Sequence, residues 1–328
     1  MNEFGKLLKL NIYGTSHNES FGILMDNVPV GIKLNEEDFL DDLNRRKPSK
    51  KYETKRNEED KPNIKSGLFN GYTNGTPLVI EFNNQNVKSN DYADFVNTPR
   101  PSHADFVANK KYHGFNDYRG GGAFSGRLTA GIVCAGVVAK KICGYRFETK
   151  ILQIGSLKDM DQKDKYLEDI ANQKDSIGGI IQIKVKDVPI GLGEPYFYSV
   201  ESAISQILYS IGSVKGVSFG IGFDGVNLKG SEFNDVIIDK QGHTKTNNNG
   251  GINGGISNGN DLIINVFVKP IASIMQEQET FDFKENKMTT LEIQGRHDVS
   301  IVERVMVVLE DAVAVALADL YLLNKALY

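Results

Sequence analysis

The residues with the clearest chemical potential lie in a glycine-rich segment between two arginines. The segment RGGGAFSGR, at 119–127, leads directly into a helical pattern. Glycine lets backbone N–H groups approach a ligand closely because no Cβ stands in the way. The start of a helix adds unpaired N–H donors and a partial positive charge. Arginine adds donors suited to carboxylate and phosphate, so the segment predicts a site for an anionic ligand.

Three of the five histidines lie in turns rich in glycine, serine or arginine. They are His17 in GTSH at 14–17, His103 in RPSHAD at 100–105, and His297 in GRHD at 295–298. Histidine titrates near neutral pH and is the usual proton donor or acceptor in an active site. A single histidine in such a turn most often makes a structural hydrogen bond. Three in similar contexts indicate a site.

The arginines indicate what the site binds. Five of them lie within two residues of a glycine or proline: Arg46, Arg100, Arg119, Arg127 and Arg296. A single solvated arginine contributes little, whereas several that converge predict a ligand with more than one negative group. Asp298 precedes a helix expected from about residue 300, and its local pattern favours a charge at a helix N-terminus over catalysis. The chain has no GxSxG motif, which argues against covalent catalysis by Ser16 or Ser125.

The composition is that of a soluble globular protein. The chain has 328 residues, a formal net charge of −4 and a pI near 5.8, which argues against nucleic acid as the main partner. No signal peptide or transmembrane span is expected, because charged residues interrupt the apolar C-terminal stretch. Cys134 and Cys143 are expected to be buried free thiols, and no metal-ligand spacing such as CxxC or HExxH occurs.

The pattern of apolar residues predicts one continuous α+β unit over residues 1–328. Strands are expected around 7–13, 22–28, 77–82, 180–185 and 262–268, and helices at 35–44, 125–143, 199–211 and 299–325. The segment NNNGGINGGISNG at 247–259 has the composition of a flexible surface loop. Its repeated Gly-Gly-Ile unit also suits a backbone nest for a ligand, and both interpretations stay open.

Taken in order, the motifs of this chain resemble those of the chorismate synthase family over nearly the full length. The matching segments are GTSH (14–17), RRKP (45–48), RPSHAD (100–105), RGGG (119–122), GLGEP (191–195), VKGV (214–217), GGIS (254–257), KP (269–270) and GRHD (295–298). Each is weak alone, and nine in the same order are highly specific. The resemblance implies a layered β-α-β sandwich and a lyase of aromatic amino acid biosynthesis. It would eliminate phosphate from 5-enolpyruvylshikimate 3-phosphate, in the anti-1,4 sense, to give chorismate.

The resemblance also implies a reduced-FMN cofactor and a role for each main site residue. His17 would protonate the departing phosphate, His103 would keep the reduced flavin correctly protonated, and Asp298 would assist proton removal through the flavin N5. Ser16 and Ser125 would support these groups by hydrogen bonding. The residues implied to bind the anionic groups of the substrate are Arg46, Lys51, Arg100, Arg127 and Arg296. Those implied to contact FMN are Ala123, Phe124, Ser125, Gly212, Ser213, Gly254, Lys269, Pro270, Ile271, Ala272, Ser273 and Arg296.

By the same resemblance we expect a cytoplasmic homotetramer. Its reduced flavin would come from a separate reductase or another outside source, so NADPH with oxidised FMN should not drive turnover by the isolated protein. Thr15, Asn18 and Ala123 depart from the usual family motifs. These departures leave a catalytically impaired flavin- or anion-binding homologue as the alternative. A phosphoryl-transfer enzyme is disfavoured because GxxxxGK[ST] and clustered acidic metal ligands are absent.

Overall fold

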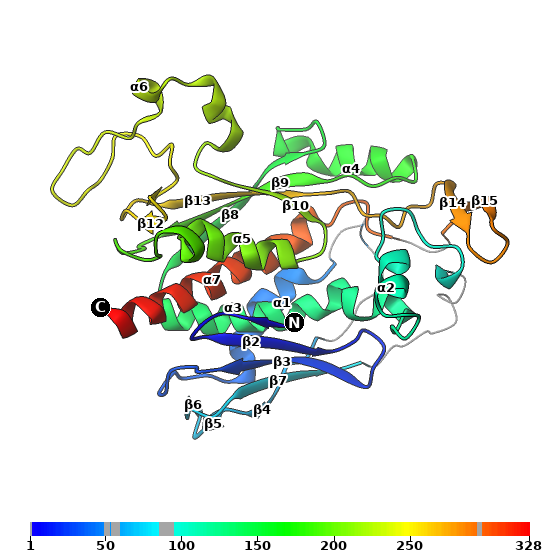
Figure 1. Cartoon of the computed structure of the whole chain (residues 1–328), viewed down its shortest axis with the longest axis horizontal. Helices are drawn as coiled ribbons and strands as arrows, with labels where there is room; N and C mark the ends of the chain where they lie inside the picture. The colour runs from blue at the N-terminus through cyan, green and yellow to red at the C-terminus, as the bar shows by residue number, and fades with distance from the viewer. Residues whose placement is uncertain (1, 49–52, 54–59, 85–94, 294–296) are drawn as a thin grey trace.

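Two antiparallel sheets enclose a layer of helices in the computed structural model, which describes residues 2–48, 53, 60–84, 95–293 and 297–328 (Figure 1). The first sheet has the order β1-β2-β3-β7-β4 and the second the order β10-β13-β9-β8. The helices α3, α5 and α7 lie between them. The layered β-α-β arrangement predicted from the sequence is therefore confirmed.

The first sheet consists of β1 (Glu3–Phe4), β2 (Lys9–Gly14), β3 (Ser20–Asp26), β7 (Leu78–Asn83) and β4 (Asn63–Ser66). Along β3 and β7 the buried residues alternate with partly exposed ones, so one face packs on the helices. Phe21 and Phe82 stack on that face with ring centroids 5.1 Å apart. The strands expected around 7–13, 22–28 and 77–82 are confirmed.

The second sheet consists of β8 (Arg146–Ile154), β9 (Gly179–Lys186), β13 (Leu262–Val268) and β10 (Val214–Phe219). Ile181 and Ile183 of β9 and Ile264 of β13 are fully buried, and the residues between them are partly exposed. The alternation that predicted β9 and β13 therefore marks the face toward the helices. The sequence analysis did not identify β8 and β10.

The helical layer is formed by α1 (Leu40–Arg46), α3 (Thr129–Cys143), α5 (Val200–Ser210) and α7 (Val302–Leu327). A Cβ on Gly136 of α3 would lie 2.1 Å from the Cβ of Asp311 on α7. Glycine is therefore required where these two helices touch. Asn35 caps the short 3₁₀ helix η1 (Glu36–Phe39) with a capping box, as its position before three acidic residues predicted.

One segment, Arg119–Cys143, is long and apolar enough to pass a test for membrane spans. In its most apolar window, 67% of the residues are buried inside the protein. Its helix α3 packs against α7 and against β3. These properties are those of a core helix between two sheets. Cys134 and Cys143, both in α3, carry free thiols as expected.

Helix α7, near the C-terminus, holds the N-terminal segment of the chain. Asp319, which is 1% exposed, accepts hydrogen bonds from the backbone N–H groups of Lys6, Leu7 and Leu8 at 2.8–2.9 Å. The hydroxyl of Tyr198 donates to the same carboxylate at 2.9 Å. The turn between β1 and β2 is thus held by a residue more than three hundred positions later in the chain.

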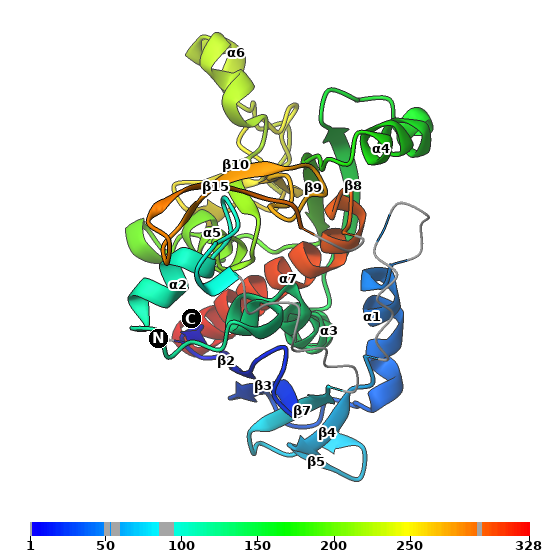
Figure 2. The same cartoon turned by 90° about the vertical axis from the view of Figure 1, so that its right-hand side faces the viewer.

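Several smaller elements lie around the layers. They are β5 (Leu68–Phe69), β6 (Tyr72–Thr73), α2 (Asp105–Lys111), α4 (Lys163–Asn172), α6 (Gly230–Phe233), β11 (Ile252–Asn253), β12 (Ile256–Ser257), β14 (Gln278–Asp282), β15 (Lys287–Leu291) and the 3₁₀ helices η3 (Arg119–Phe124), η4 (Gly126–Leu128), η5 (Met160–Gln162), η6 (Tyr196–Tyr198) and η7 (Gly222–Asn227). Residues 220–249, which include α6 and which we call the arm, project away from the layers in both views (Figures 1 and 2).

The glycine-rich segment at 247–259 is not an irregular surface loop. It forms the hairpin β11–β12, whose backbone bonds to the segment that precedes α5. Val200 N–H donates to the Gly255 carbonyl, and Ser257 N–H donates to the Leu192 carbonyl, each at 2.9 Å. The expectation of a flexible loop is wrong because these long-range bonds fix the backbone.

Candidate active site

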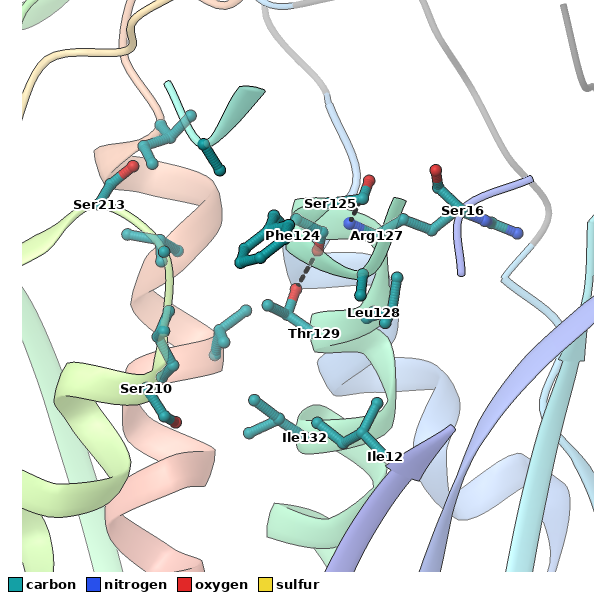
Figure 3. A pocket seen from close by; sticks show the side chains of 18 of the residues that line it. Ile12, Ser16, Phe124, Ser125, Arg127, Leu128, Thr129, Ile132, Ser210 and Ser213 are labelled. Carbon is teal, nitrogen blue, oxygen red and sulfur yellow. Dashed lines mark hydrogen bonds between the residues drawn. The ribbon is translucent and has the colours of Figure 1, made fainter. Parts of the chain in front are cut away.

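A cavity of about 1010 Å³ lies at one end of the helical layer (Figure 3). It is bounded by the C-terminal ends of α1 and α5 and by the N-terminal ends of α3 and α7. Two helix N-termini at one cavity favour an anionic ligand. The predicted site residues that line it are Ser16, Arg46, His103, Ala123, Phe124, Ser125, Arg127, Gly212, Ser213, Lys269, Ile271, Ala272, Ser273 and Asp298. Lys51 and Arg296 lie outside the described residues.

His103 lines the cavity from the turn that precedes α2. Its Nδ1 lies 2.6 Å from Oδ1 of Asp105, the first residue of that helix. Burial acts to raise the pKa of Asp105, but hydrogen bonds from Arg100 and His103 outweigh it and hold that pKa well below its ordinary value. The imidazole therefore faces an ionised carboxylate on one side and the cavity on the other.

Arg100, which the resemblance implies to be a substrate ligand, is not among the described residues that line the cavity. Its guanidinium donates twice to the carboxylate of Asp105, from Nε and Nη2, each at 2.8 Å. Nη1 donates to Ser273 Oγ at 3.1 Å, and the group lies 4.5 Å from the ring centroid of Phe95. The buried donors of Arg100 are thus engaged by the protein, and the side chain lies behind His103.

His17 is buried at the turn between β2 and β3, and Ser16 beside it lines the cavity. Ser16 Oγ lies 3.0 Å from His17 Nδ1 and donates to the carbonyls of Arg119 and Gly120 at 3.0 and 3.1 Å. Thr15 and Asn18, which differ from the usual residues of the family motif, form hydrogen bonds in this turn. Thr15 Oγ1 donates to Asn18 Oδ1 and to Asp117 Oδ2 at 2.9 and 3.0 Å.

The triple glycine acts differently from the prediction. None of the three glycines is among the described residues that line the cavity, whereas the residues after them are. All three have positive φ, at 57°, 80° and 54°. A Cβ on Gly120 would lie 2.2 Å from Cε1 of His17, and one on Gly122 would lie 1.9 Å from the Asp117 carbonyl oxygen. The glycines allow a close turn that packs on His17 and aims Ala123–Arg127 at the cavity.

Arg46 and Arg127 share one buried carboxylate. Arg46 Nη1 donates to Asp60 Oδ2 at 2.6 Å, and Arg127 Nη1 donates to Asp60 Oδ1 at 2.8 Å. Burial raises the pKa of Asp60, while the charge of Arg46 opposes that rise. We call these three residues the cavity network. Two guanidinium groups thus share one described carboxylate on the cavity wall.

Asn84 connects the cavity network to the turn that carries His17. Its Oδ1 accepts a hydrogen bond from Arg127 Nε at 2.7 Å. Its Nδ2 donates to the carbonyls of Thr15 and Asn18 at 3.2 and 2.6 Å. A shift of the Arg127 side chain would therefore be transmitted to the turn that holds His17.

Asp298 lines the cavity just before α7 and is bound by an arginine from that helix. Arg304 Nη1 donates to Asp298 Oδ2 at 2.6 Å, and Arg304 Nε donates to the Arg46 carbonyl at 3.1 Å. Asp298 precedes α7, which begins at Val302 with Ile301 as its N-cap, so it lies outside the first turn where a helix-terminal charge was expected. The pairing with Arg304 fixes the carboxylate at the cavity rather than in solvent.

The opposite wall is less charged. Figure 3 shows Ser210 and Ser213 on one side of the cavity, with Phe124, Ser125 and Arg127 across from them. Ser213 adopts a φ of 75°, which is uncommon outside glycine, and its carbonyl accepts from the Lys269 N–H at 2.9 Å. Burial and the nearby Lys215 lower the pKa of Lys269. The apolar residues of this region include Ile132, Ile207, Ile211, Ile301, Val305 and Val308.

Two predicted cofactor contacts lie apart from the described cavity lining. Gly254 is at the turn of the β11–β12 hairpin, and a Cβ there would meet nothing within 4 Å. Pro270 is absent from the lining although Lys269 and Ile271 on either side belong to it. The glycine repeat packs on the chain before α5, as Gly255 shows by its contact with Ser199.

Sequence reasoning missed four polar residues of the site: Asp60, Asn84, Asp105 and Arg304. Asp105 had a signal, since it stands in the same motif as His103. Asp60 lies in a charged stretch, and its partners come from α1 and η4, so no local pattern marks it. Arg304 looked like a polar interruption of an apolar helix.

The comparisons with known proteins agree with one another. The chain matches the family model described as chorismate synthase over residues 8–322. The chorismate synthase of Chitinophaga pinensis is 50% identical over 327 residues, covering 99% of this chain and 98% of the relative. That of Pyrococcus abyssi is 40% identical and covers 98% of each chain. A crystal structure of chorismate synthase has a similar fold, with a TM-score of 0.74 and 24% identity over 97% of this chain and 92% of the other.

Proposed function

The chain belongs to the chorismate synthase family, and from this membership we propose how its cavity performs the reaction. The protein is a carbon–oxygen lyase of aromatic amino acid biosynthesis that converts 5-enolpyruvylshikimate 3-phosphate into chorismate with loss of phosphate. The observation that carries the residue assignments is the meeting of His103, Ser125, Arg127 and Asp298 at one cavity. They come from three segments, and the first and last of these residues are almost two hundred positions apart in the sequence.

We propose that the cavity binds reduced FMN together with the substrate. Its volume of about 1010 Å³ is at the upper end of ordinary ligand sites. The residues that line the cavity fit the cofactor. Apolar side chains such as Ile211 and Val305 can pack against a flavin ring. Ser213, Lys269 and Ser273 supply donors for its polar groups. Reduced FMN supplies an electron-rich, protonatable ring for an elimination that has no net redox change.

Arg46 and Arg127 are the proposed ligands of the anionic groups of the substrate. The two guanidinium groups of the cavity network and the N-termini of α3 and α7 both favour a ligand with a phosphate and two carboxylates. Asp60 holds both guanidinium groups in place before the ligand arrives, so little side-chain order has to be gained on binding. Ser125 lies at the same wall.

His17 is the proposed acid for the departing phosphate. Ser16 Oγ donates to a backbone carbonyl, so its oxygen can accept a hydrogen bond from His17 Nδ1–H. That arrangement orients the imidazole, which in its protonated form would supply the proton. Asp298, fixed by Arg304, is the proposed carboxylate for removal of the ring proton, and His103 is the proposed group that controls protonation at the cofactor.

We further propose a homotetramer in the cytoplasm that takes reduced flavin from a separate source. The arm supports assembly, because it exposes large apolar side chains although its backbone is well bonded. Phe223 and Val226 are 85% and 86% exposed. Asp235 meanwhile accepts from the backbone N–H groups of Asn248 and Asn249 at 2.8 and 2.9 Å. An ordered apolar surface of this kind is typical of a contact with another subunit.

The experiment that tests the proposal is anaerobic turnover of 5-enolpyruvylshikimate 3-phosphate with chemically reduced FMN. Phosphate release and chorismate absorbance should appear together, and only when the flavin is reduced. Oxidised FMN with NADPH and no reductase should give no turnover. Binding of flavin and substrate without phosphate release would contradict the assigned residue roles. It would instead identify Thr15, Asn18 and Ala123 as changes that abolish the chemistry.

A further inference from the structure

A carboxylate and a guanidinium group lie behind His103, outside the roles assigned above. We propose that Asp105, held by Arg100, is a positioning residue that fixes His103 in the tautomer with its proton on Nδ1. Nε2 is then the atom that exchanges a proton with the bound ligand. The chemical use of that proton rests on the proposed function, whereas the tautomer itself can be measured without turnover.

The contacts at His103 Nδ1 allow one proton arrangement. Asp105 Oδ1 lies 2.6 Å away, and Arg100 Nη2 lies 3.1 Å away and also donates to Asp105 Oδ1 at 2.8 Å. An unprotonated Nδ1 would place two acceptors 2.6 Å apart with no hydrogen between them. A proton on Nδ1 gives a short charge-assisted hydrogen bond to the carboxylate. Arg100 Nη2–H then donates a hydrogen bond to Asp105 Oδ1, which accepts hydrogen bonds from both Arg100 and His103.

Arg100 keeps Asp105 ionised and in place. Its side chain and that of Asp105 are each 8% exposed, and two hydrogen bonds of 2.8 Å join Nε and Nη2 to the two carboxylate oxygens. This bidentate pairing fixes the plane of the carboxylate, which a lysine could not do. The pairing also keeps Asp105 from turning away from His103.

The same arginine links His103 to the segment predicted to contact FMN. Arg100 Nη1 donates to Ser273 Oγ at 3.1 Å, and Ser273 is 8% exposed. Ser273 and His103 both line the cavity. A single buried guanidinium group therefore sets the position of the histidine relative to the 269–273 segment. Arg100 contributes to the reaction as a positioning residue and not as a substrate ligand.

The chain contains a matched control pair. In the arm, His243 Nδ1 lies 2.6 Å from Asp239 Oδ2, the same separation as in the His103–Asp105 pair. The side chains of this control pair are 58% and 36% exposed, and no described arginine pairs with Asp239. The variants Asp105→Asn and Asp239→Asn therefore make the same chemical change in two environments.

The first measurement is ¹⁵N magic-angle-spinning NMR of the full-length apoprotein labelled at histidine, with the His103 signals assigned by their loss in His103→Gln. Wild-type protein should show His103 protonated at Nδ1, and Asp105→Asn should produce a mixture of tautomers. Asp239→Asn should change only the His243 signals. A wild-type His103 with an unprotonated Nδ1 would overturn the proposal without any variant.

The second measurement is turnover by the same proteins with reduced FMN. Asp105→Asn should lower kcat by about 10- to 10⁴-fold with little change in KM, the range seen when an orienting partner of a functional histidine is lost. Arg100→Lys should also lower kcat because one ammonium cannot fix the carboxylate plane. Asp239→Asn should keep wild-type kcat. A folded Asp105→Asn protein with wild-type kcat would refute the positioning role.

The two readouts separate this inference from the proposed function. Protonation of wild-type His103 at Nδ1 in a protein with no turnover would refute the function and leave the tautomer assignment standing. Active protein whose His103→Gln variant is equally active would remove His103 from the mechanism and refute the positioning role with it. Thermal unfolding of each variant shows whether a loss of kcat comes from loss of the fold.

Discussion

Two charge networks share helix α1, and they differ in whether they meet the cavity. The cavity network joins Arg46 and Arg127 through Asp60. The second, which we call the core network, joins α1, α3 and α7. It consists of Asp42, Arg45, Lys140, Glu310 and Asp311. Adjacent residues of α1, Arg45 and Arg46, belong to different networks.

The charged groups of the core network pair with one another. Lys140 Nζ lies 2.9 Å from Asp42, 2.7 Å from Glu310 and 2.8 Å from Asp311. Burial acts to raise the pKa of Glu310, but hydrogen bonds from Arg45 and the charge of Lys140 outweigh it and lower that pKa to about 2. Burial raises the pKa of Asp311 well above its ordinary value. The network pairs two cations, Arg45 and Lys140, with three carboxyl groups.

The comparison separates a structural use of buried charge from a functional one. The core network has no member in the cavity lining that the structure describes. The cavity network has all three members in that lining, so its two guanidinium groups are placed to meet an anionic ligand. This difference predicts opposite results for substitutions in the two networks.

The largest expected effect is on catalysis, in the cavity network. Arg127→Ala should lower kcat/KM by about 30-fold or more, mainly through KM, because loss of a buried charged ligand contact costs about 2–5 kcal/mol. Arg45→Ala is the control from the core network and should keep kcat/KM near the wild-type value in folded protein. Steady-state phosphate release measures both variants. A large rise in KM for Arg45→Ala would contradict the prediction that only the cavity network contributes to substrate binding.

The next effect is on stability, in the core network. Lys140→Met removes the cation that contacts Asp42, Glu310 and Asp311 together, and removal of one partner of a buried ion pair costs about 3–5 kcal/mol. Urea unfolding should show this loss, while kcat/KM of the folded protein stays near wild type. The control is Lys141→Met, which removes a partly exposed pair with Asp38 and should cost about 1 kcal/mol or less. Equal losses for the two lysines would contradict a buried core network.

The smallest predicted effect is the pH dependence of stability through Glu310. Its folded pKa of about 2 lies below the unfolded value of 4.5, so its contribution is complete above pH 4.5 and is lost as the pH falls toward 2. The loss amounts to at most about 3 kcal/mol. Urea unfolding at several acidic pH values should show a shallower decline for Glu310→Gln than for wild type. Parallel curves would show that Glu310 is not ionised through the core network.

Local sequence patterns predicted the elements that carry the site better than the contacts within it. Alternating apolar residues marked β9 and β13, and Asn35 before three acidic residues marked the start of a helix. These signals are local, because each depends on neighbours within a few positions. β8 was missed because its polar and apolar residues are less regularly spaced. The hairpin at 252–257 was missed because long-range bonds, not composition, order it.

Residue types and motifs in the sequence predicted which residues belong to the site, whereas the fold shows which groups each of them contacts. The sequence placed His103 and Arg127 correctly at a common cavity. The resemblance to the family implied that Arg100 binds the substrate. Only the fold shows that Asp105 and Ser273 use its donors. Asp60 had no local signal, since its significance comes from two arginines on separate helical segments.

The bond between Asp319 and the backbone of residues 6–8 also sets a time order for folding. These partners are separated by more than three hundred residues, so ribosomal synthesis at about 5–20 residues per second needs roughly 16–60 s to produce the second after the first. During that interval α3, α5 and the second sheet lack the helix that packs against them, and the apolar faces that α7 later covers stay exposed. Contacts of such long sequence separation form slowly even in a complete chain. The nascent protein is therefore most vulnerable to aggregation just before its last helix leaves the ribosome.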